Sequence, residues 1–377
     1  MAYWNHNKGK TFIVAEIGQN HQGSVSTAKR MIHAAKECGA DCVKFQRSSL
    51  PDKFTASALA RPYNGPNSWG STYGEHKAWL EFSADQYREL QRFASEIGIL
   101  FTASAMDAAA FRELEQDLCV PFIKIGSGDA DNVPLLRYAS NRPVPLIIST
   151  GMQDWAHVCI MYETFRHRQD VALLHCVSAY PTPLEDTMLR MITLYRTHFP
   201  ELTIGYSGHE LGIQLTVASV ALGAKIVERH FTLDKTWKGT DHQASLDPAE
   251  FARMVRCIRT IELEDITEES LSDRLRSVLG EKDFNEQHLL AALKKVDLLD
   301  RKLLESEKPC YNKLGKSLVY ASDLHSGAVI SEADIGVKVS DPPGLSPRRY
   351  DSIIGKVLID NVLRDSPVLE RHFGTHK

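Results

Sequence analysis

TFIVAEIG (11–18) is the first of eight short apolar runs that punctuate the first 231 residues of this chain. Longer stretches, in which apolar residues recur at helical spacing, separate the runs. Eight strand–helix units predict an α/β fold, a (β/α)8 or TIM barrel, whose active site opens at the C-terminal ends of the strands. The other seven runs are DCVKFQ (41–46), ILFTAS (99–104), FIKIGS (122–127), PLIISTG (145–151), VALLHCVS (171–178), TIGYSG (203–208) and KIVERHF (225–231).

Polar side chains cluster where these runs end. In a TIM barrel the C-terminal ends of all eight strands meet at one mouth, so these side chains are expected to share one cavity. The pattern therefore predicts an enzyme. The residues are Glu16, Lys44, Gln46, Ser104, Lys124, Ser127, Ser149, Ser178, Ser207, His209 and His230.

The length of 377 residues exceeds the roughly 250 residues of a typical barrel, so a second small domain is expected. We predict a barrel over 1–265 and a helical linker over 266–308, where Leu289, Leu293, Val296, Leu299 and Leu303 recur at helical spacing. Short strands and many turns predict a compact β-rich domain over 309–377. The segment 49–85, rich in Pro, Gly, Ser and aromatic residues, leaves strand two at the catalytic end and is expected to shape the pocket.

Composition excludes several classes of protein. The net charge of −4, without a basic block, argues against a nucleic acid as partner. No apolar stretch approaches the roughly 20 residues that span a membrane, and the N-terminus lacks a secretory signal, so we expect a cytoplasmic protein. The seven cysteines are odd in number and form no CxxC pair, which is typical of reduced core thiols.

Two histidines end adjacent strands. His209 follows the seventh run and His230 lies in the eighth, so both imidazoles are expected to meet on one metal ion. Such an open site polarises a carbonyl group. Glu228 shares the inward face with His230 and is expected to orient it or to approach the ion. The alternative is a pair of satisfied core histidines.

Lys44 and Lys124 each lie at a strand end. A lysine that points into a barrel mouth is costly unless it meets an anion, so these two predict phosphate or carboxylate binding. Ser104, Ser127, Ser149 and Ser207 are candidate hydroxyl donors to the same small anionic substrate. The alternative is a Schiff-base lysine, as in class I aldolases.

Glu16, at the end of the first run, is a candidate general acid or base, because burial in the barrel raises a carboxyl pKa toward a useful value. The alternative is a structural ion pair with one of the lysines. Tyr180 and Asp241 follow the sixth and eighth runs and are candidates for binding a polar substrate such as a sugar. Alternatively, each is a surface loop residue.

Several longer motifs carry a specific resemblance to the sialic acid synthase family. The resemblance covers essentially the whole barrel, and the C-terminal segment is similar to the family's antifreeze-like (β-clip) domain. RPYNGPNSWGSTYGEHK (61–77) and LDKTWKGTDH (233–242) resemble the animal branch, whose acceptor is N-acetylmannosamine 6-phosphate. The family motifs are AEIGQNHQG (15–23), GADCVKFQ (39–46), KIGSGD (124–129), ISTGM (148–152), YSGHE (206–210) and ALGAKIVERHFTLD (221–234).

The resemblance implies that phosphoenolpyruvate condenses with the open-chain sugar phosphate to give N-acetylneuraminate 9-phosphate and phosphate. His209 and His230 match the ligands of a divalent Mn or Mg ion, and Glu16 matches the acid/base residue. Gln46, Tyr180 and Asp241 match sugar contacts, and a domain-swapped homodimer is implied. The positions that match phosphoenolpyruvate contacts are Lys44, Ser104, Lys124, Ser127, Ser149, Ser178 and Ser207.

The sequence departs from the family pattern at three places. Ser178 stands where bacterial members have asparagine. The segment VKVSDPPG (337–344) lacks the arginine with which bacterial members cap the partner's sugar site, so Arg348 or Arg349 would have to reach by another path. The acidic stretch 262–308 is longer than the usual connector.

Three basic residues near the animal-type loops are candidates for binding the sugar phosphate. They are Lys77, Lys235 and Lys238.

Two further readings stay open. A Schiff-base aldolase that acts on sialic acid would form a lysine adduct with pyruvate. A non-catalytic protein, in which the barrel is a relic, would be expected to have lost some of the polar strand-end residues.

Overall fold

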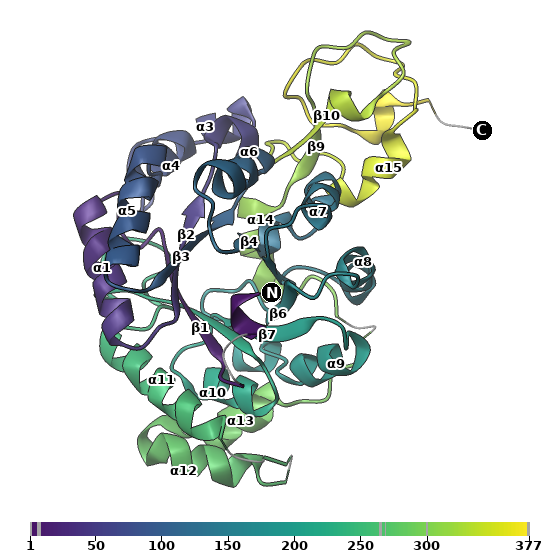
Figure 1. Cartoon of the computed structure of the whole chain (residues 1–377). Coiled ribbons are helices and arrows are strands. Elements are labelled where there is room, and N and C mark those ends of the chain that lie inside the picture. Colours follow the sequence, from purple (N-terminus) through teal and green to yellow (C-terminus); the bar gives the residue numbers. More distant parts are fainter. Residues whose placement is uncertain (1, 6–8, 264–265, 268, 299–300, 375–377) are drawn as a thin grey trace.

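A closed barrel of eight parallel strands forms the body of the protein, as the eight apolar runs predict (Figure 1). The computed structural model describes residues 2–5, 9–263, 266–267, 269–298 and 301–374. Each strand pairs with its sequence neighbour, and β1 closes the barrel against β8. The strands are β1 Phe12–Gly18, β2 Cys42–Arg47, β3 Leu100–Ala105, β4 Ile123–Ile125, β5 Leu146–Ser149, β6 Val171–Cys176, β7 Thr203–Gly208 and β8 Ile226–His230.

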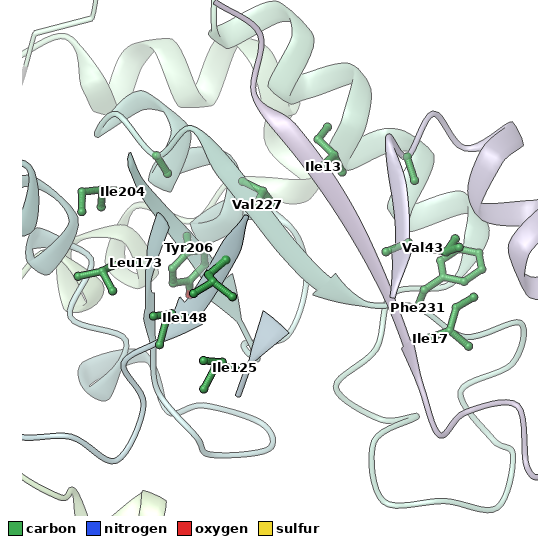
Figure 2. Close-up of a cluster of buried hydrophobic side chains, with 14 of the residues drawn as sticks. Ile13, Ile17, Val43, Ile125, Ile148, Leu173, Ile204, Tyr206, Val227 and Phe231 are labelled. Atoms are coloured by element: carbon green, nitrogen blue, oxygen red, sulfur yellow. The ribbon is translucent and has the colours of Figure 1, made fainter. Parts of the chain in front are cut away.

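Alternation along each strand separates two environments. In β1, Ile13 and Ala15 belong to the apolar layer between the strands and the helices, whereas Phe12 and Val14 belong to the separate cluster inside the barrel. Glu16 follows on the inward face, one step nearer the mouth. Figure 2 shows the outer layer, with Ile13, Val43 and Val227 on three strands. The barrel interior is thus apolar at the N-terminal end and polar at the C-terminal mouth.

The N-terminal end of the barrel is closed by the chain's own start. The short 3-10 helix Tyr3–Asn5 places Trp4 in the interior cluster. Its ring meets Phe122 edge-on at a centroid distance of 5.6 Å and lies 6.4 Å from Phe12. Tilted and edge-on contacts of this kind are favoured between aromatic rings. The opposite mouth, where the strands end, is left for the site.

Helices follow the strands and cover the outside of the barrel (Figure 1). In the first of them one apolar face is buried at Ala28, Met31, Ile32 and Ala35, while Cys38 is half-buried. The helix ends where Gly39 takes a φ of +89°, which a glycine adopts without strain. The helices are α1 Val25–Glu37, α5 Ala84–Glu96, α6 Ala108–Arg112, α7 Val133–Ser140, α8 Trp155–Phe165, α9 Arg190–His198, α10 Gln214–Ala221 and α11 Pro248–Ile261.

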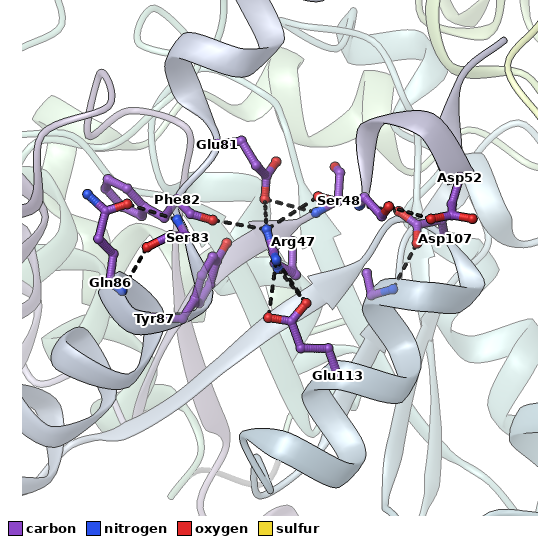
Figure 3. Close-up of polar contacts among 12 residues, drawn as sticks. Arg47, Ser48, Asp52, Glu81, Phe82, Ser83, Gln86, Tyr87, Asp107 and Glu113 are labelled. Carbon is purple, nitrogen blue, oxygen red and sulfur yellow. Dashed lines mark hydrogen bonds and ion pairs between the residues drawn. The ribbon is translucent and has the colours of Figure 1, made fainter.

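The segment 49–85 folds over the mouth as three short helices, α2 Leu50–Lys53, α3 Ala56–Ala60 and α4 Tyr73–Leu80. Arg47, at the end of β2, joins the C-terminal end of this segment to Glu113, which follows α6 (Figure 3). Its guanidinium donates to Glu81 at 2.9 Å and to Glu113 at 3.0 Å. Charge-assisted pairs of this kind have a fixed planar geometry, so the insertion keeps one position on the barrel.

The predicted helical linker contains two helices, α12 Leu271–Asp283 and α13 Glu286–Ala292, which pack on α10 and α11. A helix or a helical pair was expected here, with helical spacing through Val296 and Leu303, but α13 ends at Ala292 and these two residues lie outside it. The carbonyl of Ala292 accepts from the backbone of Leu189, and the carbonyl of Leu293 accepts from Arg190. Neighbouring groups therefore take the carbonyls that a longer helix would need. Leu299 lies outside the described residues.

The C-terminal segment begins with α14 Lys308–Leu314 and continues as a small antiparallel β domain with its own apolar core. Strand β9 Ser317–Tyr320 pairs with β10 Ile335–Lys338, and α15 Tyr350–Ile353 follows. Figure 1 shows this domain beside the barrel, near α7.

All seven cysteines are free thiols, as expected. Over the ranges that the structure describes, no helix has the length and apolar character to cross a membrane.

A fully buried ion pair joins β8 to the loop after β7. Arg229 donates to a carboxylate oxygen of Glu210 at 2.9 Å and to the backbone carbonyl of the same residue at 2.7 Å. Tyr206 and Thr216 donate to the same carboxylate. Both charged side chains are fully buried, so each depends on the other for its hydrogen bonds.

Replacement of this arginine is expected to cost stability. In an Arg229→Met variant Glu210 is left buried without its counter-charge, so the free energy of unfolding should fall by about 3–5 kcal/mol. Denaturant unfolding measures this difference. Arg88→Met, which removes an exposed pair with Asp85, is the matched control and should cost less than about 1 kcal/mol. Equal losses in the two variants would contradict the prediction.

Candidate active site

A cavity of about 540 Å³ opens among the C-terminal ends of the barrel strands. The predicted catalytic, phosphoenolpyruvate-binding, sugar-binding and metal-binding residues all line it, so the structure brings this set to one place. The roles assigned to them remain predictions. These residues are Glu16, Lys44, Gln46, Ser104, Lys124, Ser127, Ser149, Ser178, Tyr180, Ser207, His209, His230 and Asp241.

The register of the strands explains this convergence. Glu16 pairs with Lys44 on one side and with His230 on the other. Ser104 pairs likewise with Gln46 and with Lys124. Residues that pair directly in parallel strands point to the same face of the sheet. In a closed barrel that face is the interior, and the side chains form a ring at one level.

Glu228 lies at the centre of a buried network of charges. It accepts from the ammonium of Lys124 at 2.8 and 2.9 Å, lies 3.7 Å from that of Lys44, and accepts from the Ser207 hydroxyl at 2.9 Å. The expectation that Glu228 orients His230 is not met, because its hydrogen bonds in the described structure go to Lys124 and Ser207. Burial by itself would raise the pKa of Glu228, but the two ammonium groups outweigh burial and lower it to about 2.

Glu16 forms an ion pair with Lys44, the alternative that the sequence left open. Gln46 donates to the other carboxylate oxygen at 3.0 Å, and Lys44 also donates to Ser104 at 2.8 Å. Burial raises the pKa of Glu16 above its ordinary value even though Lys44 opposes the shift. The pairing does not exclude an acid/base role, because a carboxyl with a raised pKa exchanges protons nearer to neutral pH.

His209 and His230 face each other with ring centroids 5.5 Å apart. Nδ1 of His209 lies 2.9 Å from the carbonyl of Val177, and the side chain of His209 also interacts with the Cys176 thiol. Nδ1 of His230 is buried and has no hydrogen-bond partner. Burial lowers the pKa of His230 to about 3, so its imidazole is neutral, the form that binds metals.

These observations fit an ion held by two protein nitrogens, because a buried ring nitrogen without a partner is what a metal would satisfy. No set of three or more His, Cys, Asp or Glu side chains in the described ranges could hold a metal. The remaining coordination positions would therefore belong to water or substrate.

Tyr180 and Asp241 lie on the outer side of the two imidazoles. The Tyr180 ring lies 4.1 Å from that of His209 between centroids, and 41% of its surface is exposed. Asp241 accepts from the Thr240 hydroxyl at 2.7 Å. An aromatic face and a carboxylate at a half-open edge can contact the hydroxyl groups of a sugar.

Ser127 and Ser178 approach each other over Gly151. A Cβ at Gly151 would lie 2.3 Å from the Ser178 hydroxyl and 2.5 Å from that of Ser127, so only glycine permits this approach. The backbone N–H of Ser178 donates to Glu307 at 3.0 Å, and Glu307 pairs with the buried Arg301. This Arg301–Glu307 brace comes from the connector and was missed, because a charged pair in an acidic stretch has no distinctive sequence pattern.

The three lysines proposed for a sugar phosphate separate in the structure. Lys77 lines the cavity. Lys235 instead pairs with Glu250 at 2.5 Å, and Lys238 stacks over the Trp69 ring at 4.8 Å. Two cavity lysines, Lys53 and Lys313, were missed, because they come from the insertion and from α14 rather than from strand ends.

The two arginines considered as caps are engaged elsewhere in the single chain. Arg348 donates to Gln153 at 2.8 Å and pairs with Asp154, whereas Arg349 pairs with Glu370 at 2.8 Å. Among the described residues, none beyond Leu314 lines the cavity. The β domain therefore leaves the mouth of its own barrel uncovered.

Comparisons with known proteins agree with this architecture. The NeuB family model matches residues 31–269, and the SAF domain model matches residues 315–373. The N-acetylneuraminate-9-phosphate synthase of Drosophila melanogaster is 49% identical over 95% of this chain and 94% of its own, and that of Homo sapiens is 45% identical over 99% and 95%.

Solved structures that cover nearly the whole chain are also similar to it. The spore coat polysaccharide biosynthesis protein SpsE of Bacillus subtilis superposes with a TM-score of 0.75 and 27% identity, over 98% of this chain and 96% of the other. Family models, full-length relatives and the superposition agree. This chain belongs to the NeuB family and carries a SAF domain at its C-terminal end.

Proposed function

We propose that this chain is an N-acetylneuraminate-9-phosphate synthase, which condenses phosphoenolpyruvate with N-acetylmannosamine 6-phosphate in sialic acid biosynthesis. The identity of 45–49% to the two animal synthases over nearly the full length supports this acceptor. The main structural support for this type of reaction is the shared cavity. In it, two buried lysine side chains and a ring of serine hydroxyls lie beside two imidazoles.

Lys44 and Lys124 provide the positive charge that a phosphate and a carboxylate require. Both ammonium groups are almost fully buried, and Ser104, Ser149 and Ser207 add hydroxyl donors around them. In a buried site such charge-assisted hydrogen bonds are about twice as strong as neutral ones. These lysines and serines orient phosphoenolpyruvate so that its carbon 3 attacks the sugar aldehyde. Water then adds at carbon 2, and phosphate leaves.

His209 and His230 would hold a divalent Mn or Mg ion, which supplies Lewis-acid polarisation of the aldehyde. Glu16 is positioned beside this pair through its register with His230, and its raised pKa suits proton exchange with the new hydroxyl group. Tyr180 and Asp241 at the outer edge contact the sugar chain. Gln46 holds Glu16 in place.

The Schiff-base aldolase is less well supported. A Schiff base needs a neutral amine. Burial would lower the pKa of Lys44, but Glu16 and Glu228 outweigh burial and raise it. Lys124 hydrogen-bonds both oxygens of Glu228. Lys44 is therefore arranged as an ammonium group, and for Lys124 the contact with Glu228 opposes the lowering of its pKa by burial.

An assay of phosphate release distinguishes the two reactions. Incubation with phosphoenolpyruvate and N-acetylmannosamine 6-phosphate should release one phosphate per sugar consumed, and a chelator should stop turnover until Mn is restored. Pyruvate with borohydride should leave no lysine adduct. A trapped adduct, with no phosphate released, would favour the aldolase instead.

Replacement of one imidazole should weaken binding of the ion itself. Outer-sphere partners of metal ligands already contribute about 10- to 100-fold in affinity, so loss of a direct ligand in His230→Ala should cost more than tenfold in Mn binding. Electron paramagnetic resonance of free Mn measures this without turnover. His33→Ala, an exposed histidine of α1, is the control. Equal Mn affinity in both variants would refute the ligand assignment.

We further propose a homodimer in which each SAF domain covers the partner's cavity. The support is that the described SAF domain adds no residue to the cavity of its own chain. Light scattering during gel filtration should give twice the chain mass of 42.2 kDa. A monomeric protein with full activity would contradict this arrangement.

A further inference from the structure

The cavity contains more positive charge than the strand ends supply. Three lysines, Lys53, Lys77 and Lys313, line it in addition to Lys44 and Lys124. The carboxylates in its lining are Glu16, Glu228 and Asp241, and the first two pair with Lys44 and Lys124. The three additional lysines are therefore not needed to neutralise the carboxylates of Glu16 and Glu228.

These three lysines, which we call the outer lysines, lack counter-ions. Lys53 is 4% exposed and Lys77 is 7% exposed. The ammonium of Lys77 donates to the neutral amide oxygen of Gln19 at 2.7 Å, and none of the three forms an ion pair within the described structure. Ammonium groups buried in this way are costly unless an anion reaches them.

Carboxylates near the outer lysines are committed to other cations. Glu81 accepts from Arg47 at 2.9 Å, as Figure 3 shows, and Asp129 pairs with Lys316 at 2.5 Å. Asp241 is the remaining acidic group of the lining, and it forms no ion pair with a lysine in the described residues. The protein thus leaves the outer lysines for a ligand.

The outer lysines also lie close enough to affect one another. Burial lowers the pKa of Lys77 well below its ordinary value, and the charges of Lys53 and Lys313 lower it further. Burial likewise lowers the pKa of Lys53 to about 8. Like charges that repel in this way gain most from a divalent anion placed between them.

Three separate segments hold the outer lysines in place. Lys53 ends α2 and Lys77 lies in α4, both within the insertion that Arg47 clamps. Lys313 lies in α14, which follows directly after the buried Glu307. An apolar cluster of Phe54, Ala58, Tyr73 and Val339 packs α2 against α4, and its described members include none from α14. A shared ligand gives a physical reason for the arrangement.

We propose that Lys53, Lys77 and Lys313 form a second anion subsite, which binds the phosphate group of the acceptor sugar. This inference rests on the proposed function, because that reaction joins two phosphorylated substrates in one cavity. The strand-end lysines take phosphoenolpyruvate, and the outer lysines select a phosphorylated acceptor over a free one. Both phosphates are then held by different cations, so neither substrate competes for the other's subsite.

The test is the preference between acceptors, measured on the full-length enzyme as the ratio of kcat/KM for N-acetylmannosamine 6-phosphate to that for free N-acetylmannosamine. Each charged contact to the phosphate should contribute roughly tenfold to a hundredfold. The ratio should fall by this factor in Lys77→Met and in Lys313→Met. Lys313 is only partly buried, so its variant provides the test even if Lys77→Met does not fold.

Two lysines of the same chain serve as comparisons. Lys235→Met removes a charge outside the cavity and should leave the ratio unchanged. Lys124→Met should raise the KM for phosphoenolpyruvate by roughly tenfold or more without lowering the preference for the phosphorylated acceptor.

The outcomes separate the two proposals. An unchanged acceptor ratio in Lys77→Met or Lys313→Met, with normal phosphate release by the wild-type enzyme, overturns the second subsite alone. Failure of the wild-type enzyme to release phosphate with either acceptor overturns the proposed function, and the assignment of the outer lysines to a sugar phosphate falls with it.

Discussion

The carboxylate of Glu228 lies at the centre of the buried charges at the polar end of this barrel. It bonds the ammonium of Lys124 with both oxygens and lies 3.7 Å from that of Lys44. Two like charges inside a closed barrel repel each other and lose their hydration, and both costs are offset only when a counter-charge lies between them. Glu228 supplies it for both lysines and Glu16 adds a second counter-charge for Lys44, so the positions of the lysines are fixed before any substrate enters. The mouth is preorganised for anions.

Successive residues of β8 have different roles. Glu228 and His230 point inward to the cavity, whereas Arg229 points outward and pairs with Glu210 behind them. Glu210 follows His209, so this buried pair links the backbone next to one imidazole with the backbone next to the other. A residue between two functional residues of a strand thus helps to hold them in place. It points to the opposite face, because side chains alternate along a strand.

Segments outside the barrel contribute as much to the cavity as the strands do. The insertion brings Lys53 and Lys77, and α14 brings Lys313, over a rim of strand ends. Glu307 ties the connector to the barrel through the backbone N–H groups of Met152 and Ser178. The connector is therefore part of the site and not a spacer between two domains.

The eight strands and the inward residues at their ends could be predicted from the sequence, because the two-residue period and the apolar runs are local properties of the chain. The choice of Lys44 as the partner of Glu16, the end of α13 at Ala292 and the position of Lys313 could not be predicted. Each of these depends on groups that are distant in sequence and meet only when the barrel closes. Local patterns determine which side chains point inward, but only tertiary packing determines which charges lie within bonding distance of one another, because electrostatic energy depends on separation in space.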